Sequence, residues 1–214
     1  MMRTGIFSGA FLCLLLLCGC SFGYFEMGKQ REASYEQVEA DGKGWFYLKD
    51  SVSRRGVIYE GFKVKRIKGS PLKVYVQQNS PNTAVWRVDP AEFGGEQLVC
   101  TASRIVLPME LSQKMTGGND LSFYCKFKFS RDPQMQHFSV NVSEWKEEPA
   151  AEFILKTAPA EGKMQVTHGF VVFHPYEPGV LLEIRYHQTD GGEKTLELRE
   201  FGEKFLQSVV PLKR

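Results

Sequence analysis

The chain has few of the residues and patterns that point to a particular chemistry. Its 214 residues include only four histidines and five cysteines, and the motifs GxGxxG, GxxxxGK[ST] and HExxH do not occur. The sequence thus offers no dinucleotide site, phosphate loop or zinc-protease helix. Charge of either sign is also not in excess, with 27 Lys and Arg against 25 Asp and Glu, so no overall charge draws the chain to nucleic acid. We expect no catalytic residues and no cofactor, and predict that the protein is not an enzyme.

A long apolar run is missing as well. From Ile6 to Leu17 the chain carries no charge, but a run of about 12 residues is too short to cross a bilayer core of about 30 Å, which needs about 20. One basic residue, Arg3, precedes this run, and small and polar residues follow it. This layout is typical of a secretory signal peptide. We therefore predict an exported protein without a stable transmembrane helix.

The end of the apolar run holds a cysteine in a distinctive setting. Leu17-Cys18-Gly19-Cys20 resembles the lipobox of bacterial lipoproteins, in which an aliphatic residue, a short residue and Gly or Ala precede the modified cysteine. The resemblance implies that the sulfur of Cys20 receives a diacylglyceryl group, that the chain is cut before Cys20, and that the new amino group is acylated. Cys18 fits the pattern poorly, because Leu17 would then stand next to the cut. The alternative is a plain secreted protein with an incidental cysteine.

The resemblance also predicts a location. Several acyl chains such as palmitate make an anchor effectively permanent, at about 0.8 kcal/mol per buried CH₂. Ser21 rather than Asp follows the cysteine, which in the enteric sorting scheme implies transfer to the outer membrane. We expect the protein in the bacterial cell envelope, on the periplasmic side of the outer membrane. The expected organisation is a signal peptide over 1–19, a lipidated N-terminus and tether over 20–42, and a β-rich globular domain over 43–214.

Two cysteines then remain for the domain, Cys100 and Cys125. Outside the cytoplasm two leftover cysteines more often pair than stay free, so we predict a disulfide bond between them. A loop of this length would stabilise the fold by about 3.5 kcal/mol on the chain-entropy estimate. The alternative is a Cys-His nucleophile, which needs a lowered thiol pKa. Cys125 lies in an alternating run of phenylalanines, where desolvation makes a thiol harder to ionise.

Alternation with a period of two dominates the domain. Apolar and polar residues alternate over 72–76, 121–129 and 138–142, which predicts half-buried antiparallel strands. Clusters of Gly, Pro, Asn and Asp separate these segments and leave little room for the crossover helices of a parallel sheet. We predict a mainly β fold of antiparallel, sandwich-like sheets with a C-terminal amphipathic helix. An α+β fold is the alternative.

One β-hairpin can be aligned from the segment HGFVVFHPYEPGVLLEIRYH. A turn centred on residues 177–178 sets Phe173 opposite Leu182, and apolar residues then face each other along one side. The same alignment sets His168 opposite His187, with Cβ atoms about 5 Å apart. Two imidazoles at this distance can share a metal ion, but two ligands do not make a site. We therefore favour a surface pair of histidines over a metal centre.

The tail REFGEKFLQSVVPLKR changes to a helical period. Phe201, Phe205 and Val209 recur at steps of four residues, which predicts a helix that packs its phenylalanines on a sheet. We expect a final edge strand through Leu196 and Leu198 before it. The end of the chain, from LLEIRY through EFGEKFLQSVV, resembles the closing strand and helix of PsbP-like lipoproteins. This resemblance covers about 30 residues and implies only the arrangement of strand and helix.

A second resemblance concerns two separated segments, SPNTAVW and FVVFHPYEPGVLLEIRY. They are similar to the loop and the hairpin of chagasin-type cysteine-protease inhibitors, which are β-sandwich proteins. Ala84 and Val85 stand where that family has Gly-Tyr, and its Gly-rich middle loop is not found. The resemblance implies an inhibitor in which the SPN loop and the YEPG turn lie at the same end of the fold.

Basic residues gather in two places, Lys63 with Lys65 and Lys126 with Lys128. Each pair alternates with apolar residues, as outward-facing lysines of strands do, and such lysines discourage aggregation of sheets. A binding face for anionic envelope glycans or lipids is the second interpretation.

Taken together, these patterns predict a membrane-anchored envelope lipoprotein with a structural or binding role, for instance an accessory subunit of an envelope complex. Its expected partners are the membrane, held through the N-terminal lipid, and an envelope protein or glycan, but not nucleic acid. A protease or lysozyme inhibitor is the second candidate function, and an enzyme of unfamiliar type is the third.

Overall fold

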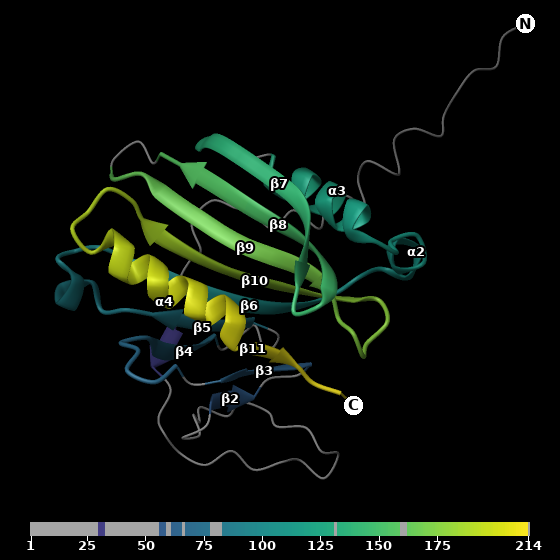
Figure 1. Ribbon diagram of the computed structural model, residues 1–214, viewed down its shortest axis with the longest axis horizontal. Coiled ribbons are helices and arrows are strands. Elements are labelled where there is room, and N and C mark those ends of the chain that lie inside the picture. Colours follow the sequence, from purple (N-terminus) through teal and green to yellow (C-terminus); the bar gives the residue numbers. More distant parts are fainter. Residues whose placement is uncertain are drawn as a thin grey trace, which may run out of the picture.

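A broad twisted sheet carries one long helix on each of its faces (Figure 1). The computed structural model describes residues 30–32, 56–58, 61–65, 67–77, 83–130, 132–158 and 162–213. The predicted signal peptide, Cys20 and most of the predicted tether lie outside these residues. No helix in the described ranges has the length and apolar character needed to cross a membrane.

Eight strands form the large sheet, and all neighbouring strands are antiparallel. Their order is β1-β4-β5-β6-β10-β9-β8-β7. The edge strand β1 falls within the segment predicted as a tether, so part of that segment belongs to the sheet. The strands are β1 (Gln30–Glu32), β4 (Lys73–Gln77), β5 (Thr83–Arg87), β6 (Leu98–Val106), β7 (Met135–Trp145), β8 (Glu148–Thr157), β9 (Gln165–Phe173) and β10 (Val180–Thr189).

One face of this sheet is covered by a small sheet and a helix. The small sheet has the order β11-β3-β2 and consists of β2 (Gly56–Ile58), β3 (Phe62–Lys65) and β11 (Val209–Pro211). Helix α4 (Thr195–Ser208) lies beside it on β10 and β6. Phe62, Phe205 and Trp86 are buried together in the core that these elements share. The prediction of a mainly antiparallel β fold with a C-terminal helix is confirmed.

The opposite face is covered by helix α3 (Gly118–Phe129), which packs on β7, β8 and β9. Leu121, Cys125 and Phe129 are buried there in a second core, together with Phe153 of β8. Two short helices complete the described chain: η1 (Pro90–Phe93) precedes β6, and α2 (Met109–Ser112) precedes α3. The large sheet is therefore the middle of three layers.

The prediction of a strand over 121–129 is wrong, because this segment is most of α3. Apolar residues recur there at every second and at every fourth position, so both periods fit the sequence. The helix buries Leu121, Cys125 and Phe129 and turns the other apolar residues outward. Asp120 accepts hydrogen bonds from two backbone N–H groups before the helix, at 2.8 and 3.1 Å. The preceding Gly-rich cluster is thus a helix start and not a turn between strands.

The C-terminal helix is confirmed, but it begins earlier than predicted. Leu196 and Leu198 belong to α4, so the expected edge strand is wrong. A carboxylate from a distant loop fixes the start: Glu96 accepts hydrogen bonds from the Lys194 backbone N–H at 2.9 Å and from the Thr195 hydroxyl at 3.3 Å. Because Glu96 is 98 residues away from Lys194, no local sequence signal marks this helix start.

The two strands of the predicted hairpin are present, but their register differs by one residue. Phe173 pairs with Leu181 and not with Leu182. The loop that sets this register closes with a hydrogen bond of 2.8 Å from the His174 N–H to the Val180 carbonyl. Because both faces of the sheet are buried, either register sets apolar residues opposite each other, and the apolar pattern could not distinguish them.

Candidate functional site

The two cysteines predicted to pair lie on opposite faces of the large sheet. Cys100 is on β6 in the core under α4, and Cys125 is on α3 in the other core; both are free. The predicted disulfide is therefore wrong, because it rested on placing Cys125 in a strand. Burial raises the pKa of the Cys100 thiol, and it is the main cause that raises the pKa of Cys125 to about 12. Thiols this hard to ionise are poor nucleophiles and metal ligands.

The two histidines suggested as a metal pair also lie on opposite faces. Tyr186 is opposite His168, and Thr167 is opposite His187, so the two imidazoles cannot share an ion. His187 is hydrogen-bonded to the Thr167 hydroxyl at 2.9 Å. Burial, with a smaller effect of Arg185, lowers its pKa to about 4. Among the residues that the structure describes, no group of three or more His, Cys, Asp or Glu is arranged to hold a metal.

The four lysines of the predicted basic faces do not form one surface. Lys63 and Lys65 are on β3, in the layer that contains α4. Lys126 and Lys128 are on α3, across the large sheet. Lys126 is exposed, but Lys128 turns toward the sheet and forms an ion pair with Glu183 of β10. The prediction that these lysines face outward from strands therefore fits Lys63 and Lys65 but not Lys126 and Lys128, which lie on a helix.

The pair of Lys128 and Glu183 lies between α3 and the sheet. The Glu183 carboxylate is buried, and Arg185 approaches its other oxygen at 3.5 Å. Burial alone raises the pKa of Glu183, but the attraction of Lys128 and Arg185 outweighs it, so the pKa is lowered. Glu183 is therefore a buried anion that holds α3 to β10, and both of its oxygens are engaged.

A polar cluster on the α4 side of the large sheet surrounds His168. The Nε2 atom of His168 lies 2.8 Å from Glu152 Oε1 on β8, and Nδ1 lies 3.0 Å from Glu203 Oε1 on α4. The Tyr186 hydroxyl donates a hydrogen bond of 2.8 Å to the same Glu203 oxygen. Three strands and the helix thus meet at one imidazole, of which only 13% of the side chain is exposed.

The charges of this cluster follow from its geometry. Burial alone lowers the pKa of His168, but hydrogen bonds to Glu203 and Glu152 outweigh it and the pKa is raised. The hydrogen bond from His168 in turn lowers the pKa of Glu203, and burial with the bond to Glu203 raises the pKa of Tyr186. Both ring nitrogens of an imidazolium are donors. With both of them on carboxylates, His168 has no lone pair for a substrate or metal, and its role is to clamp α4 to the sheet.

Gly202 allows this clamp to close. A Cβ atom at Gly202 would lie 2.5 Å from Cγ of the Tyr186 ring, well inside van der Waals contact. The helix can therefore approach β10 closely only because residue 202 has no side chain. The same approach brings Glu203 within hydrogen-bond distance of Tyr186.

The sequence contained a partial signal for this cluster. His168 alternates with Phe170 and Val172 on one strand face, and that face is the one on which a C-terminal helix with apolar residues would pack. Glu203 follows Arg199 by four residues on the helix. The predicted hairpin register was off by one residue and concealed the contact of His168 with Tyr186. Strand β8 was not predicted, so Glu152 could not be placed beside His168.

The YEPG turn is fixed by internal contacts. The His174 Nε2–H donates to the Gly61 carbonyl at 2.5 Å, and Nδ1 accepts from the Tyr176 N–H at 3.2 Å. Arg104 of β6 binds Glu177 of the turn at 2.5 Å. These bonds join the turn to β6 and to Gly61, the residue before β3 of the small sheet.

The loop that would complete a chagasin-like site, over 79–82, lies outside the described residues. Ala84 and Val85, which follow it, are buried in β5. The expected arrangement of the SPN loop beside the YEPG turn therefore lies outside the described residues.

Comparisons with known proteins found likenesses of fold at low identity. No protein-family model and no curated protein matches the chain. PA94 from Pseudomonas aeruginosa, a protein of unknown function, is 12% identical, with a TM-score of 0.42 over 72% of this chain and 99% of its own. LpqN from Mycobacterium tuberculosis, which is involved in cell envelope biogenesis, is 11% identical, with a TM-score of 0.38 over 87% of this chain and 86% of its own.

A third solved structure is the cyanobacterial PsbP of Synechocystis, which is 10% identical, with a TM-score of 0.32 over 90% of this chain and 98% of its own. It is a member of the PsbP group that the closing strand and helix resemble in sequence. At these identities and TM-scores, no function passes from the three proteins to this chain.

Proposed function

We propose that this chain is a bacterial lipoprotein, anchored to an envelope membrane through Cys20, whose domain acts by binding and not by catalysis. The observation that carries the anchoring is Leu17-Cys18-Gly19-Cys20 at the end of a short apolar run. A run of this length suits export and processing, and several acyl chains on Cys20 would hold the domain permanently at a membrane surface.

The engagement of three of the four histidines and of both domain cysteines supports a role in binding. His168 and His174 use both ring nitrogens in internal hydrogen bonds, and His187 is buried and bonded to a neighbouring hydroxyl. Both domain cysteines are buried, and burial raises their pKa values. A general base needs a free nitrogen, and a nucleophile needs an ionised thiol. These side chains instead stabilise a rigid scaffold, as suits a structural or accessory subunit of an envelope complex.

The anchoring is tested by labelling cells of a Gram-negative host with a palmitate analogue while they express the full chain. We expect the native chain and the matched control Cys18→Ser to carry the label and to sediment with membranes. The Cys20→Ser variant should lose the label and accumulate as an unprocessed precursor. Label that persists in Cys20→Ser would show that Cys20 is not the anchor. A hydrolytic activity of the purified protein that one substitution abolishes would contradict the binding role.

A further inference from the structure

The outward side of α2 and α3 exposes large apolar side chains. Met109 and Leu111 of α2 are 76% and 44% exposed, and Phe123 and Phe127 of α3 are 71% and 45% exposed. Val106, which precedes α2 at the end of β6, is 60% exposed. Because Phe123 and Phe127 are four residues apart, they lie one above the other on the helix. We call these five residues the apolar face.

The two helices of this face are held together. The Asp120 carboxylate of α3 binds the backbone N–H groups of Thr116 and Gly117 in the link from α2. Met115, in the same link, packs into the core under α3. Figure 1 shows α2 beside α3 at one end of the molecule. The face is therefore part of the folded domain.

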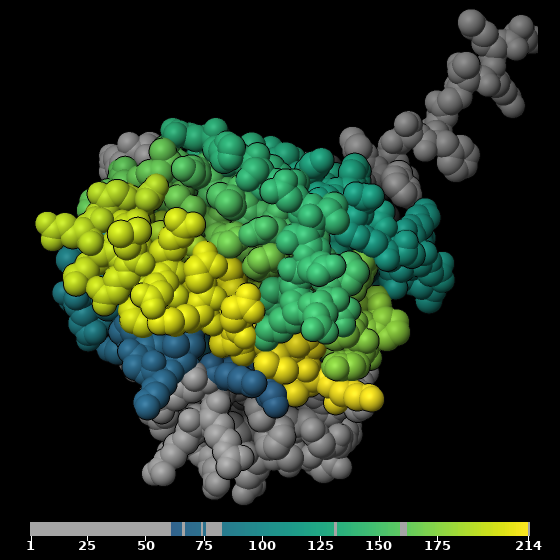
Figure 2. All heavy atoms as spheres, in the orientation of Figure 1, coloured from purple at the N-terminus to yellow at the C-terminus, as the bar shows by residue number. Residues whose placement is uncertain are grey.

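Helix α4, on the opposite side of the sheet, has a different outward surface. It forms exposed ion pairs between Lys194 and Glu197 and between Lys204 and Glu200, as water-facing helices commonly do. Only one of its large apolar side chains, that of Leu196, is strongly exposed. In the view of Figure 2, α4 lies across the front of the molecule, while α2 and α3 lie toward the upper right and behind the sheet.

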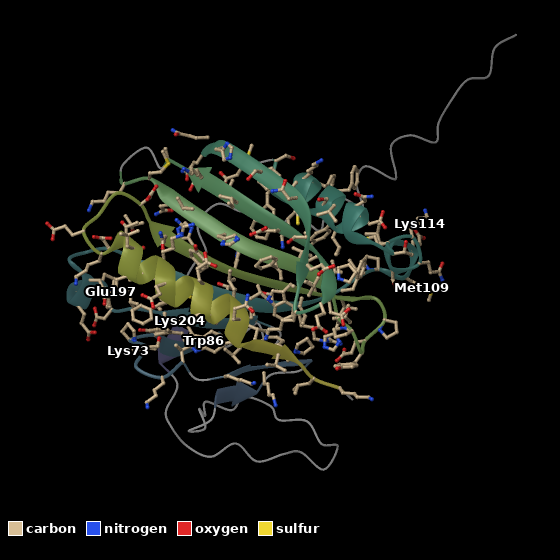
Figure 3. All side chains as sticks on the ribbon, in the orientation of Figure 1. Lys73, Trp86, Met109, Lys114, Glu197 and Lys204 are labelled. Carbon is tan, nitrogen blue, oxygen red and sulfur yellow. The ribbon has the colours of Figure 1, made fainter. Side chains whose placement is uncertain are left out.

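Two exposed lysines border the apolar face. They are Lys114 and Lys126, and of the acids over 106–129 Glu110 is exposed and Asp120 is half-buried. Asp120 is held by its backbone hydrogen bonds. Met109 and Lys114 project together from the α2 end, away from Glu197 and Lys204 of α4 (Figure 3). Phenylalanine and leucine on one side with lysine at the rim is the pattern of helices that rest in the headgroup region of a membrane.

The short link to Cys20 brings this face within reach of a bilayer. Strand β1 begins at Gln30, ten residues after Cys20, and ten residues span at most about 35 Å when fully extended. Eight strands spaced at about 4.8 Å give a sheet about 34 Å across. The anchored domain is thus never farther from the membrane than about its own width.

We propose that the apolar face docks on the phospholipid surface to which Cys20 anchors the chain. This inference rests on the proposed lipidation, because the anchor supplies the high local concentration that turns a weak surface contact into a stable one. Phe123 and Phe127 enter the boundary between headgroups and acyl chains, and Lys114 and Lys126 lie against lipid phosphates. The docked domain directs α4 and the small sheet away from the bilayer, where they can meet a partner.

The test uses the mature lipidated chain in vesicles of phosphatidylglycerol and brominated phosphatidylcholine, since bromine on the acyl chains quenches nearby tryptophan. The variant Phe127→Trp reports on the apolar face, and the matched control Leu196→Trp reports on an exposed apolar site of α4. The native tryptophans are subtracted with the unsubstituted chain. We expect the brominated lipid to remove most of the added fluorescence of Phe127→Trp and little of that of Leu196→Trp.

Equal quenching of the two variants, or quenching of the α4 control alone, would overturn the docking. So would a blue shift of Phe127→Trp without quenching, which would show that a second copy or another protein covers the face. The mass of the N-terminal peptide from the same vesicles separates the two proposals. A lipidated Cys20 with an unquenched Phe127→Trp refutes docking and leaves the anchor intact, whereas an unmodified Cys20 refutes the anchor.

Discussion

A single imidazole, that of His168, links α4 to two strands of the large sheet. Its partners are the carboxylates of Glu152 and Glu203, and Glu203 also accepts a hydrogen bond from Tyr186. Since the pKa of His168 is raised in the folded protein, this clamp is fully formed below the pKa of an unfolded histidine, near 6.5. Its contribution to stability is lost as the pH rises through the folded pKa.

The substitution His168→Gln should therefore destabilise the protein more in acid than in alkali. We expect it to lower the free energy of unfolding by about 1 kcal/mol more at about pH 5.5 than at about pH 9, because two charge-assisted hydrogen bonds to partly exposed carboxylates are lost. Urea unfolding at the two pH values measures this difference. The control is His137→Gln, at an exposed position of β7. A loss of stability independent of pH would contradict a protonated His168.

A second residue-scale prediction concerns Gly202. In an exposed helix Gly→Ala stabilises by about 1 kcal/mol, but here the new Cβ would lie 2.5 Å from the Tyr186 ring. We expect Gly202→Ala to lower the free energy of unfolding by about 1 to 3 kcal/mol, because the helix must move away from β10. The matched control is Glu200→Ala, at an exposed position of α4, which should change stability by less than about 0.5 kcal/mol. A stabilised Gly202→Ala would show that α4 is not packed this closely.

At the scale of elements, α3 is the segment whose structure the sequence hid most effectively. Its neighbouring lysines have opposite surroundings, since Lys126 is exposed and Lys128 pairs with the buried Glu183. The pKa of Glu183 is lowered, so its contribution to stability is present above the unfolded pKa of a glutamate and is lost as the pH falls.

We expect Lys128→Met to cost about 2 kcal/mol near neutral pH, because it leaves Glu183 buried with only Arg185 nearby. The cost should shrink toward about pH 4, as the carboxylate takes up a proton. Lys126→Met is the matched control and should leave the unfolding midpoint unchanged. If the two substitutions have equal effects, α3 does not present Lys128 to the sheet.

The positions of α3 and β6 also predict the behaviour of the two cysteines. Cys100 and Cys125 lie on opposite faces of the sheet, so both should be free thiols. Because both are fully buried, the folded domain prepared without reductant should react slowly with a thiol reagent such as Ellman's reagent. Both thiols should then react rapidly after unfolding in guanidinium chloride. The loss of free thiols in the unfolded, unreduced protein would indicate the disulfide that the structure excludes.

The elements differ in how far the sequence could predict them. The alternation over 138–142 predicted β7 correctly, and the period of four from Phe201 predicted the C-terminal helix, because apolar side chains of each pack against a core. The helix ends at Ser208, however, and Val209 begins β11. The same rule failed over 121–129, where two periods coincide, and in the β9–β10 hairpin, where both faces of the sheet are covered. The His168 clamp depends on that register and on Glu203 of α4, so the sequence pattern alone could not place it.

At the scale of the whole molecule, three layers separate two surfaces of different character. The apolar face of α2 and α3 lies on one side of the large sheet, and α4 with its exposed ion pairs lies on the other. The edge strand β1 ties the N-terminal link to the sheet only ten residues after Cys20. An anchor at Cys20 would thus set both the distance of the domain from the membrane and the range of its orientations.

Cys20 is the residue that we propose as the first of the mature protein and as its attachment to the membrane. Mass spectrometry of the N-terminal peptide, from protein extracted from the membranes of a Gram-negative host, tests this proposal. We predict a peptide that begins at Cys20 and carries a diacylglyceryl group and an N-acyl chain. A mature protein with an unmodified N-terminus, or one modified at Cys18, would refute the anchor at Cys20.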